Sequence, residues 1–230
     1  MDSDKKFSVI IVAGGKGVRA GGEMPKQFVK IGGKPMIMHT IEAFHKFDNK
    51  IRIIVVLPEG LLSFWLDLCN EYKFKVRHQA ITGGETRFHS VKNGLDLVLE
   101  NETVGIHDGA RPFITTALIE RCFNESYNNN QSIIPVIDEF NSVRQLTNSG
   151  SHMIDRSKLK IVQTPQVFPG KIIKSAYSVN YNNLFTDDAS VVEKNGSKVR
   201  LVEGEVTNIK ITTTIDLELA NCYLQLLAKR

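Results

Sequence analysis

The sequence contains little cysteine, and its cysteines do not suggest a cross-link. Cys69, Cys122 and Cys222 lie far apart and form no C-x-x-C pair. Each falls in a segment that we expect to be helical, so each is better explained as a buried small apolar side chain than as part of a disulfide or a zinc site. The six histidines also lack metal-ligand spacing, which favours core or surface roles for them.

The sequence also lacks a long apolar run. No uninterrupted stretch approaches the roughly 20 apolar residues that a membrane span needs, and the charged segment 1–7 lacks the apolar core of a signal peptide. We therefore expect a cytoplasmic protein that does not bind membranes. Lys and Arg total 29 and Asp and Glu total 25, so the formal net charge is only +4. This excess does not predict nucleic-acid binding, although clustered basic residues could still bind phosphates.

What the sequence does have is the pattern of an α/β domain. Of its 230 residues, 42% are hydrophobic and 23% are charged, which is typical of a folded chain with a sizeable core. Residues 8–13 and 51–57 are continuous runs rich in β-branched residues, as in strands buried on both faces of a parallel sheet. Further strands are expected near 75–81, 104–107 and 132–136, and helices from Pro35 and near 59–72, 86–99 and 115–128. This alternation predicts a three-layer α/β/α fold with a mostly parallel, Rossmann-like sheet.

The alternation breaks after residue 136. Residues 137–162 are polar and show no helical period, and a structureless stretch of this length inside a compact domain is unusual. We therefore expect a protruding β-arm for dimerisation at about 137–162, within a single domain that spans 1–230. Beyond the arm we expect a helix near 170–180, strands near 198–202 and 207–212, and a last helix. An apolar stripe marks that last helix: Leu217, Ala220, Leu224 and Leu227.

A glycine-rich, basic loop follows the first expected strand. It contains Ala13, Gly14, Gly15, Lys16, Gly17, Arg19 and, at its far end, Lys26. Open α/β sheets bind ligands at the carboxyl ends of their strands, and glycines there let backbone N–H groups approach a phosphate. The loop has no P-loop string, and it lacks the third glycine of a dinucleotide fingerprint because residue 20 is alanine. A plain Gly-rich turn with solvated lysines is the alternative, but Arg19 and Lys26 favour a phosphate site.

This loop and five later blocks occur together in a set order. The blocks are AGGKGVRAGGEMPKQF at 13–28, GGETRFHSV at 83–91, HDGARP at 107–112, QTPQ at 163–166, TDDAS at 186–190 and NIKIT at 208–212. In this order they resemble the cytidylyltransferases that act on 2-C-methyl-D-erythritol 4-phosphate, which belong to the glycosyltransferase-A-like nucleotidyltransferases. The resemblance covers nearly the whole chain, and the ordered set is far more specific than any one block.

The resemblance implies a reaction between two polyanions. An oxygen of the acceptor phosphate attacks the α-phosphorus of CTP and pyrophosphate leaves, with no covalent enzyme intermediate. Arg19 and Lys26 are implied to stabilise the α-phosphate in the transition state. Arg156 and Lys210 are implied to bind the acceptor phosphate, with Thr164 as a hydroxyl donor. Because the arm of this family reaches the other subunit's site, the resemblance also implies a homodimer in which Arg156 acts in trans.

The resemblance assigns the other contacts as well. Those implied for the nucleotide are Ala13, Gly14, Gly15, Gly17, Gly83, Gly84, Glu85, Arg87, Ser90 and Gly109. Those implied for the acceptor are Asp108, Arg111 and Ser142. A plain helix N-terminus explains Glu85 nearly as well, and a lone aspartate such as Asp108 is also typical of a turn or cap.

Metal binding is expected to depend on the nucleotide. Mg²⁺ takes few carboxylates and several waters, so we expect it to be bound mainly by the CTP phosphates, and we identify no protein metal ligands. Asp187 and Asp188 resemble a metal pair, but the segment 186–188 precedes a helical run and is interpreted as an N-cap.

Three interpretations of the function remain open at this point. The first two differ in the acceptor, because a sister group with the same CTP loop acts on ribitol 5-phosphate and not on methylerythritol phosphate. The implied acceptor contact Ser142 does not settle this choice, since it fits the family pattern only after three extra residues at 139–141. Asp155 and Arg156, just before the QTPQ block, favour methylerythritol phosphate as the acceptor. A non-catalytic nucleotide-binding domain is the third interpretation, against which the joint presence of the basic residues argues.

Overall fold

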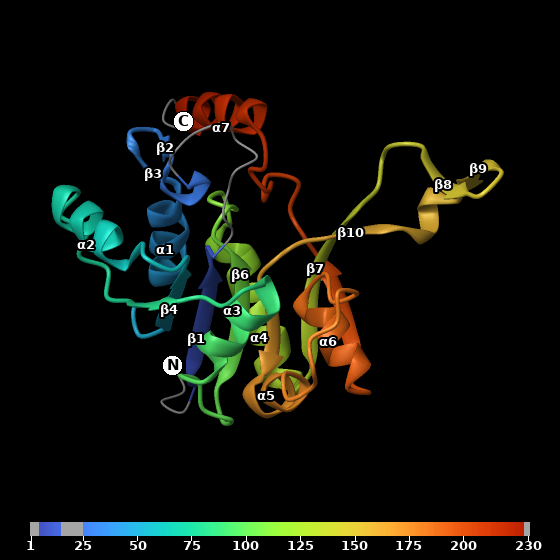
Figure 1. The fold of residues 1–230 in the computed structure, drawn as a ribbon, viewed down its shortest axis with the longest axis horizontal. Helices are drawn as coiled ribbons and strands as arrows, with labels where there is room; N and C mark the ends of the chain where they lie inside the picture. Colours follow the sequence, from blue (N-terminus) through green and yellow to red (C-terminus); the bar gives the residue numbers. More distant parts are fainter. Residues whose placement is uncertain (1–4, 15–24, 228–230) are drawn as a thin grey trace.

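The computed structural model describes residues 5–14 and 25–227, and these residues build an eight-stranded central sheet (Figure 1). Along the sheet the strand order is β10-β7-β11-β6-β1-β4-β5, and β12 pairs with β7. The strands are β1 (Phe7–Val12), β4 (Arg52–Leu57), β5 (Gln79–Thr82), β6 (Thr103–Asp108), β7 (Ser132–Asp138), β10 (Lys160–Val162), β11 (Gln166–Pro169) and β12 (Val199–Glu203).

The central strands of the sheet run parallel. In β1, Ile10 lies between Ile54 of β4 and Ile106 of β6, and all three side chains are fully buried. Such strands need a continuous apolar sequence because helices cover both of their faces. β5 continues this parallel set and β12 runs parallel to β7, whereas β11 and β10 run antiparallel to their neighbours. The predicted mostly parallel sheet is therefore confirmed, and the carboxyl ends of β1, β4, β5 and β6 share one edge.

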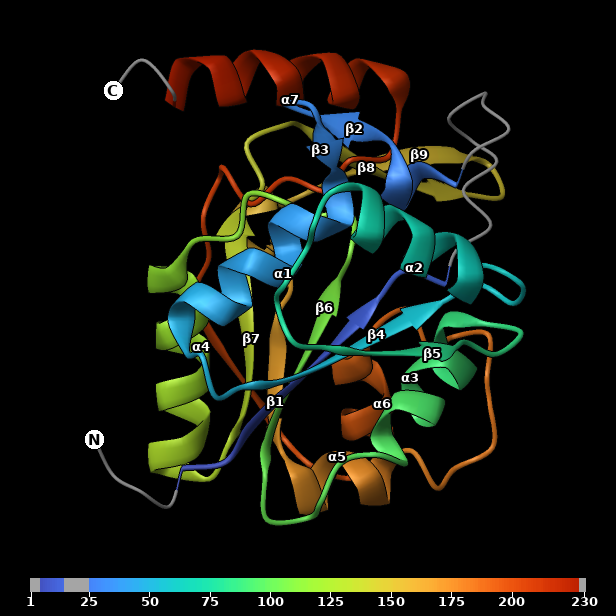
Figure 2. The same ribbon diagram turned by 90° about the vertical axis from the view of Figure 1, so that its left-hand side faces the viewer.

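Helices cover both faces of the sheet and complete the predicted three layers (Figure 2). On one face, α1 (Met36–Phe47), α2 (Leu62–Glu71) and α4 (Thr116–Asn129) pack against Val9 and Ile11 of β1. On the other face, α3 (Arg87–Leu95), α5 (Gly170–Ala176) and α6 (Asp188–Lys194) pack around Ile10. Alternate residues of one strand thus serve two separate apolar cores.

A smaller layer lies over the carboxyl edge of the sheet. It consists of the hairpin β2 (Lys30–Ile31) and β3 (Lys34–Pro35) and the last helix, α7 (Thr214–Leu227), which lies across the top of Figure 2. A third apolar cluster joins Ile31 to Ala220 of α7. Of the other predicted stripe residues, Leu217 and Leu224 pack against this cluster, but Leu227 is exposed, so the stripe is one turn shorter than expected.

A hairpin projects from the body at the position of the predicted arm (Figure 1), and its role in dimerisation stays a prediction. β8 (Val143–Thr147) and β9 (Gly150–Ile154) pair only with each other among the described strands, and the short 3-10 helix η3 (Arg156–Lys158) follows them. The ends of the predicted 137–162 segment belong to the main sheet instead, because β10 pairs with β7 up to Asp138. The projecting part is thus shorter than the sequence pattern suggested.

Two other expectations differ from the structure, and one strand was not predicted. Residues 207–212, all of them described, form no strand; Ile211 instead donates its N–H to the carbonyl of Ala110 and packs beneath α7. The short strand β11 has no counterpart among the predicted elements. Cys122 is buried and Cys69 partly buried, but Cys222 is exposed on α7. Within the described ranges, none of the helices has the length and apolar character needed to cross a bilayer.

Candidate active site

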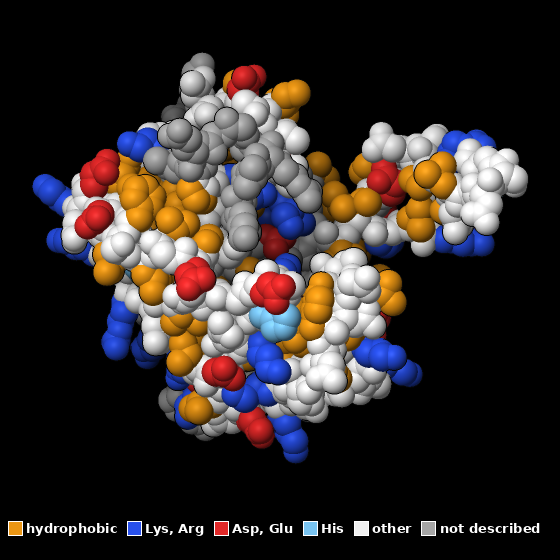
Figure 3. Space-filling model, in the orientation of Figure 1, with side chains coloured by type: hydrophobic (Ala, Val, Ile, Leu, Met, Phe, Trp, Pro, Cys, Tyr) orange, Lys and Arg blue, Asp and Glu red, His pale blue; other side chains and the backbone are white. Residues whose placement is uncertain are grey.

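A cavity of about 720 Å³ opens at the carboxyl edge of the sheet, beside the ends of β1, β5 and β6. Figure 3 shows a hollow on this side of the molecule, with basic and acidic side chains together at its floor. The predicted site residues that line the cavity are Ala13, Gly14, Lys26, Gly83, Gly84, Glu85, Arg87, Ser90, Asp108 and Lys210. Predictions for Gly15, Gly17 and Arg19 concern positions outside the described residues.

Lys26 is placed at the cavity by the short 3-10 helix η2 (Lys26–Phe28). The next two residues, Gln27 and Phe28, are buried, and the ring of Phe28 stacks on that of Trp65 in the core. This packing fixes the backbone of Lys26. Its Nζ donates to the backbone oxygen of Ile211 at 3.3 Å, so the ammonium bridges the first loop and the segment that carries Lys210.

The segment 83–86 forms the wall of the cavity between β5 and α3. The N–H of Gly84 donates to the hydroxyl of Ser90 at 3.1 Å, and this hydroxyl donates to the carbonyl of Thr86 at 2.9 Å. A Cβ on Gly84 would lie 2.4 Å from that of His89, so the close approach of the chain requires glycine here. Ser90 is buried and shapes this wall in the structure; its contact with a nucleotide stays a prediction.

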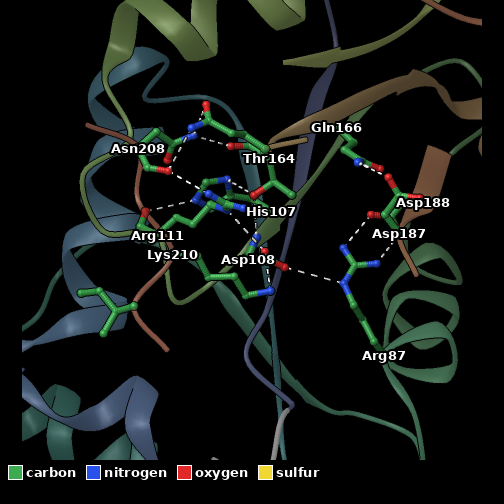
Figure 4. Close-up of polar contacts among 12 residues, drawn as sticks. Arg87, His107, Asp108, Arg111, Thr164, Gln166, Asp187, Asp188, Asn208 and Lys210 are labelled. Carbon is green, nitrogen blue, oxygen red and sulfur yellow. Dashed lines mark hydrogen bonds and ion pairs between the residues drawn. The ribbon is translucent and has the colours of Figure 1, made fainter. Parts of the chain in front are cut away.

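Asp108, the last residue of β6, is the centre of a cluster of cations (Figure 4). Its carboxylate lies 2.9 Å from Nζ of Lys210, 3.4 Å from Nε of Arg111 and 3.6 Å from Nε of Arg87. Burial alone would raise the pKa of Asp108, but the three cations outweigh burial and hold the pKa well below its usual range. At neutral pH, Asp108 is therefore a carboxylate that gathers basic side chains from three parts of the chain.

Arg87 is held from its other side by Asp188, the first residue of α6 (Figure 4). The two terminal nitrogens of Arg87 donate to the two oxygens of Asp188 at 2.9 and 2.6 Å, in a bidentate pair. Burial disfavours the charged guanidinium, but Asp188 outweighs burial and raises the pKa of Arg87. The segment 186–188 was predicted to cap this helix, and within it the side chain of Asp188 is committed to Arg87 and does not cap. Asp187 is the N-cap, as predicted, and accepts from the N–H of Ser190 at 2.9 Å.

A buried chain of hydrogen bonds supports Asp108 from behind. The backbone N–H of Asp108 donates to the hydroxyl of Thr164 at 3.1 Å, and that hydroxyl lies 3.0 Å from Nδ1 of His107. Burial lowers the pKa of His107 to about 4, so the ring is neutral at pH 7. The contacts then require Nε2–H to donate to the carbonyl of Arg111 and Nδ1 to accept from Thr164. The hydroxyl of Thr164 is thus engaged in the interior, and its donation to an acceptor phosphate stays a prediction.

Replacing Thr164 with valine is expected to lower the free energy of unfolding by about 1–3 kcal/mol. The reason is that the N–H of Asp108 and Nδ1 of His107 would both lose their buried partner. Denaturant unfolding measures the effect. Thr164→Ser keeps the hydroxyl and is the matched control, expected to cost less than about 1 kcal/mol for its lost methyl group. A valine variant as stable as the wild type would contradict this role.

Comparison with known proteins identifies the family. The family model described as 2-C-methyl-D-erythritol 4-phosphate cytidylyltransferase (IspD) matches residues 7–226. The chain belongs to this cytidylyltransferase family. The chain is 54% identical over 217 residues to the protein of that name from Bacteroides fragilis, covering 94% of this chain and 99% of the relative. With the one from Bacteroides thetaiotaomicron the identity is 52% over 219 residues, covering 95% of this chain and all of the relative.

A solved structure shares the fold of this cytidylyltransferase. The crystal structure of 4-diphosphocytidyl-2C-methyl-D-erythritol synthase from Anaerococcus prevotii superimposes with a TM-score of 0.81. The two chains are 28% identical, and the match covers 96% of this chain and 97% of the other. The α/β fold, the resemblance seen in the sequence and the assignment as a nucleotidyltransferase enzyme are therefore confirmed.

The arm residues of this cytidylyltransferase lie away from the cavity of their own chain. Ser142 and Arg156 are both exposed, and neither is among the described residues that line the cavity. Arg156 donates to the carbonyl of Phe140, in the connection that leads to the hairpin. Within one chain, the structure does not bring Arg156 to Lys210.

Two predicted residues lie directly beside the cavity of the cytidylyltransferase. The N–H of Gly109 donates to the carbonyl of Val12 at 2.9 Å, which joins the ends of β1 and β6. A Cβ on Gly109 would lie 3.2 Å from that of Ala13, so a larger residue would press on the first loop. Arg111, apart from its contact with Asp108, donates from Nη1 to the carbonyl of Asn208 at 2.8 Å.

The sequence patterns did not reveal the residues that hold Lys210 in position. The amide nitrogen of Gln163 donates to the carbonyl of Glu205 at 2.8 Å, and the amide nitrogen of Asn208 donates to the carbonyl of Thr164 at 2.8 Å. These bonds tie the segment before Lys210 to the connection between β10 and β11. Gln163 belongs to the QTPQ block and Asn208 to the NIKIT block. The sequence of the two blocks does not show that they lie side by side in the fold.

Proposed function

We propose that this protein transfers the cytidylyl group of CTP to 2-C-methyl-D-erythritol 4-phosphate, giving 4-diphosphocytidyl-2-C-methyl-D-erythritol and pyrophosphate, in non-mevalonate isoprenoid precursor synthesis in the cytoplasm. The family and the names of its relatives support this reaction and do not favour ribitol 5-phosphate. The observation that carries the proposal is the group of cations around Asp108 in a cavity shared with Lys26. Two polyanionic substrates require such a surplus of positive charge.

In this reaction the chain supplies orientation and charge. A phosphate oxygen of the acceptor forms a bond to the α-phosphorus of CTP while the bond from that phosphorus to the pyrophosphate breaks. Lys26, together with Arg19, would stabilise the charge that builds on the α-phosphate. Lys210 would receive the acceptor phosphate. Because Asp108 holds the Lys210 ammonium at 2.9 Å before any ligand binds, less ordering is needed on binding.

We propose that Mg²⁺ accompanies CTP and is bound mainly by its phosphates. Among the described residues, no group of three or more His, Cys, Asp or Glu side chains is placed to hold a metal ion. The carboxylate at the centre of the cavity, Asp108, is already surrounded by cations. This donor set fits a Mg²⁺ that keeps several waters and takes few protein ligands. When bound, the ion would neutralise phosphate charge.

We also propose a homodimer in which the arm of one subunit completes the site of the other. The support is that the arm exposes large apolar side chains, with Leu146 83% and Met153 72% exposed, and that Arg156 does not line its own chain's cavity. Exposed apolar surface on a projecting hairpin is typical of an interface. Arg156 would then meet the acceptor phosphate opposite Lys210 of the partner.

Hybrid dimers can test the action of Arg156 in trans. Mixing Lys26→Ala subunits with Arg156→Ala subunits is expected to restore roughly a quarter of wild-type activity, because half of the dimers are hybrids and each hybrid has one site with both residues intact. The two variants are co-refolded and assayed against each one alone. If Arg156 acted within its own chain, every hybrid site would carry one mutation and mixing would restore nothing.

A coupled pyrophosphate assay tests the reaction and the acceptor together. With CTP and Mg²⁺, release of pyrophosphate is expected with 2-C-methyl-D-erythritol 4-phosphate and is expected to be at least about tenfold slower with ribitol 5-phosphate, since a mispositioned acceptor loses orientation. Faster release with ribitol 5-phosphate would overturn the assigned acceptor. No release with either alcohol would leave a nucleotide-binding domain as the better interpretation.

A further inference from the structure

Asp188 carries a buried carboxylate that does not line the cavity, but its ion-pair partner, Arg87, does. Its side chain is 0% exposed. It accepts two hydrogen bonds from Arg87 and a third, at 2.6 Å, from the hydroxyl of Tyr177. Figure 4 shows the guanidinium of Arg87 lying between Asp188 and Asp108. A line of alternating charges therefore runs from the start of α6, through the start of α3, to the end of β6.

The start of α6, which carries Asp188, is itself hydrogen-bonded to the central sheet. Gln166 of β11 donates from its amide to Asp187 at 2.8 Å and accepts from the N–H of Ala189 at 2.8 Å, so it holds the residues on both sides of Asp188. Tyr177 stacks on Phe88, with ring centroids 4.6 Å apart. Asp188 is thus fixed to the sheet, and the residue after Arg87 packs against the tyrosine that donates to Asp188.

Arg87 in turn is the first residue of α3 and directly follows the 83–86 wall of the cavity. Its terminal nitrogens are both turned to Asp188, so only Nε faces Asp108, at 3.6 Å. Apart from Asp188, Asp108 is the carboxylate that forms an ion pair with Arg87 among the described residues. Arg111 and Lys210 already contact Oδ2 of that residue. A turn of Arg87 towards Asp108 would pull on the 83–86 wall and crowd the cation cluster.

We propose that Asp188 is a positioning residue for the nucleotide: by holding both ends of the Arg87 fork, it keeps the 83–86 wall in the conformation that receives CTP. This inference rests on the proposed cytidylyl transfer. Asp188 acts only through Arg87 and makes no contact with either substrate. Loss of its charge therefore weakens CTP binding, while folded molecules that do bind CTP still turn over.

Asp188→Asn tests this through steady-state kinetics and CTP binding. The variant is expected to raise the KM for CTP about tenfold with kcat changed less than about threefold, since a bidentate charged pair becomes a neutral contact. Isothermal titration with CTP and Mg²⁺ should show the same loss of affinity. A merely structural role would lower the amount of active enzyme, and hence the apparent kcat, and leave the KM for CTP unchanged. A folded variant with an unchanged KM for CTP overturns the proposal.

The adjacent aspartate is the matched control. Asp187→Asn changes the same charge at the same helix start, but Asp187 caps α6 and bonds to Gln166 and not to Arg87. It is expected to lower stability and leave the KM for CTP within about twofold of the wild type, because the Arg87 fork keeps its partner. An increase in the KM for CTP equal to that of Asp188→Asn would show that the start of α6, not the Arg87 pair, controls nucleotide binding, and would overturn the proposal.

A double variant covers the case in which Asp188→Asn does not fold. Arg87→Gln with Asp188→Asn removes both buried charges together, which a fold tolerates better than one unpaired charge. Its KM for CTP is expected to equal that of Arg87→Gln alone, because Asp188 has no effect without Arg87. A double variant with the wild-type KM for CTP overturns the proposal. The assay of the wild type distinguishes a failure of the proposed function from a failure of this inference. No pyrophosphate release by the wild type rejects the proposed function. Normal release by the wild type, with an unchanged KM for CTP in Asp188→Asn, rejects only the positioning role of Asp188.

Discussion

Replacing Lys26 with alanine is expected to lower kcat by at least about 100-fold, because a positioned cation acts on the charge that develops in the transition state. Lys26 is fixed by the buried Gln27 and Phe28 and reaches the cavity beside Ile211. The loss should appear in kcat more than in the KM for CTP. Steady-state pyrophosphate release at saturating CTP and acceptor measures it.

Lys30 provides the matched control for that experiment. It lies four residues along the chain, on β2, and its ammonium is 3.7 Å from Glu71 on the surface rather than in the cavity. Lys30→Ala removes the same charge and is expected to leave kcat within about twofold of the wild type, as exposed ion pairs contribute little. A Lys26→Ala enzyme as active as the Lys30→Ala enzyme would remove the proposed role of Lys26.

Replacing Asp108 with asparagine is expected to be the most damaging single change to the cation cluster. Arg87, Arg111 and Lys210 would be left close together without their shared carboxylate. Breaking a buried pair in this way typically costs about 3–5 kcal/mol of unfolding free energy. Because Lys210 would also lose its support, kcat/KM should fall on the order of 100-fold. Urea unfolding and steady-state kinetics measure the two effects, and Asp67→Asn on the exposed surface of α2 is the control.

The effect of Asp108→Asn on stability should depend on pH. The pKa of Asp108 is lower in the folded protein than in the unfolded chain, where an aspartate titrates near about 3.9. Its contribution to stability is therefore fully present above that pH and is lost as the pH falls through the folded pKa. The difference in unfolding free energy between wild type and variant should be constant from pH 7 to about pH 5 and shrink below about pH 4. A difference that stays constant down to pH 2 would contradict the charge pairing.

The sequence predicted the parts of the fold that depend on local pattern. The apolar runs at 8–13 and 51–57 became β1 and β4 because strands covered on both faces need apolar residues at every position. The strand predicted at 207–212 is absent from the structure. There Ile209 and Ile211 alternate with polar residues as a strand would, but they pack under α7 in the small third cluster. Alternating apolar and polar residues indicate that one side of an extended segment is buried. A segment outside a sheet can be buried on one side as well.

The candidate site was predicted only as far as its residues stand at strand ends or in recognisable blocks. Asp108 ends a strand and the 83–85 segment directly follows one, so their meeting at one edge follows from the topology. The pairing of Arg87 with Asp188 joins residues 101 positions apart and has no local signal. The sequence indicated a helix cap at 186–188, which Asp187 provides, but it gave no sign that Asp188 binds Arg87. The sequence also does not show that the hydroxyl of Thr164 is used inside the protein, because its partners, Asp108 and His107, are distant in the chain.

A crystal structure with bound 4-diphosphocytidyl-2-C-methyl-D-erythritol and Mg²⁺ would show directly how the cavity holds the two joined phosphates. We expect the cytosine to lie against the 83–86 wall and the phosphate from CTP to lie within hydrogen-bond distance of Lys26. The phosphate from the acceptor should lie between Lys210 of one subunit and Arg156 of the other. A product molecule bound outside the cavity at the ends of β1, β5 and β6, or bound there with Lys26 and Lys210 turned away from both phosphates, would contradict this expectation.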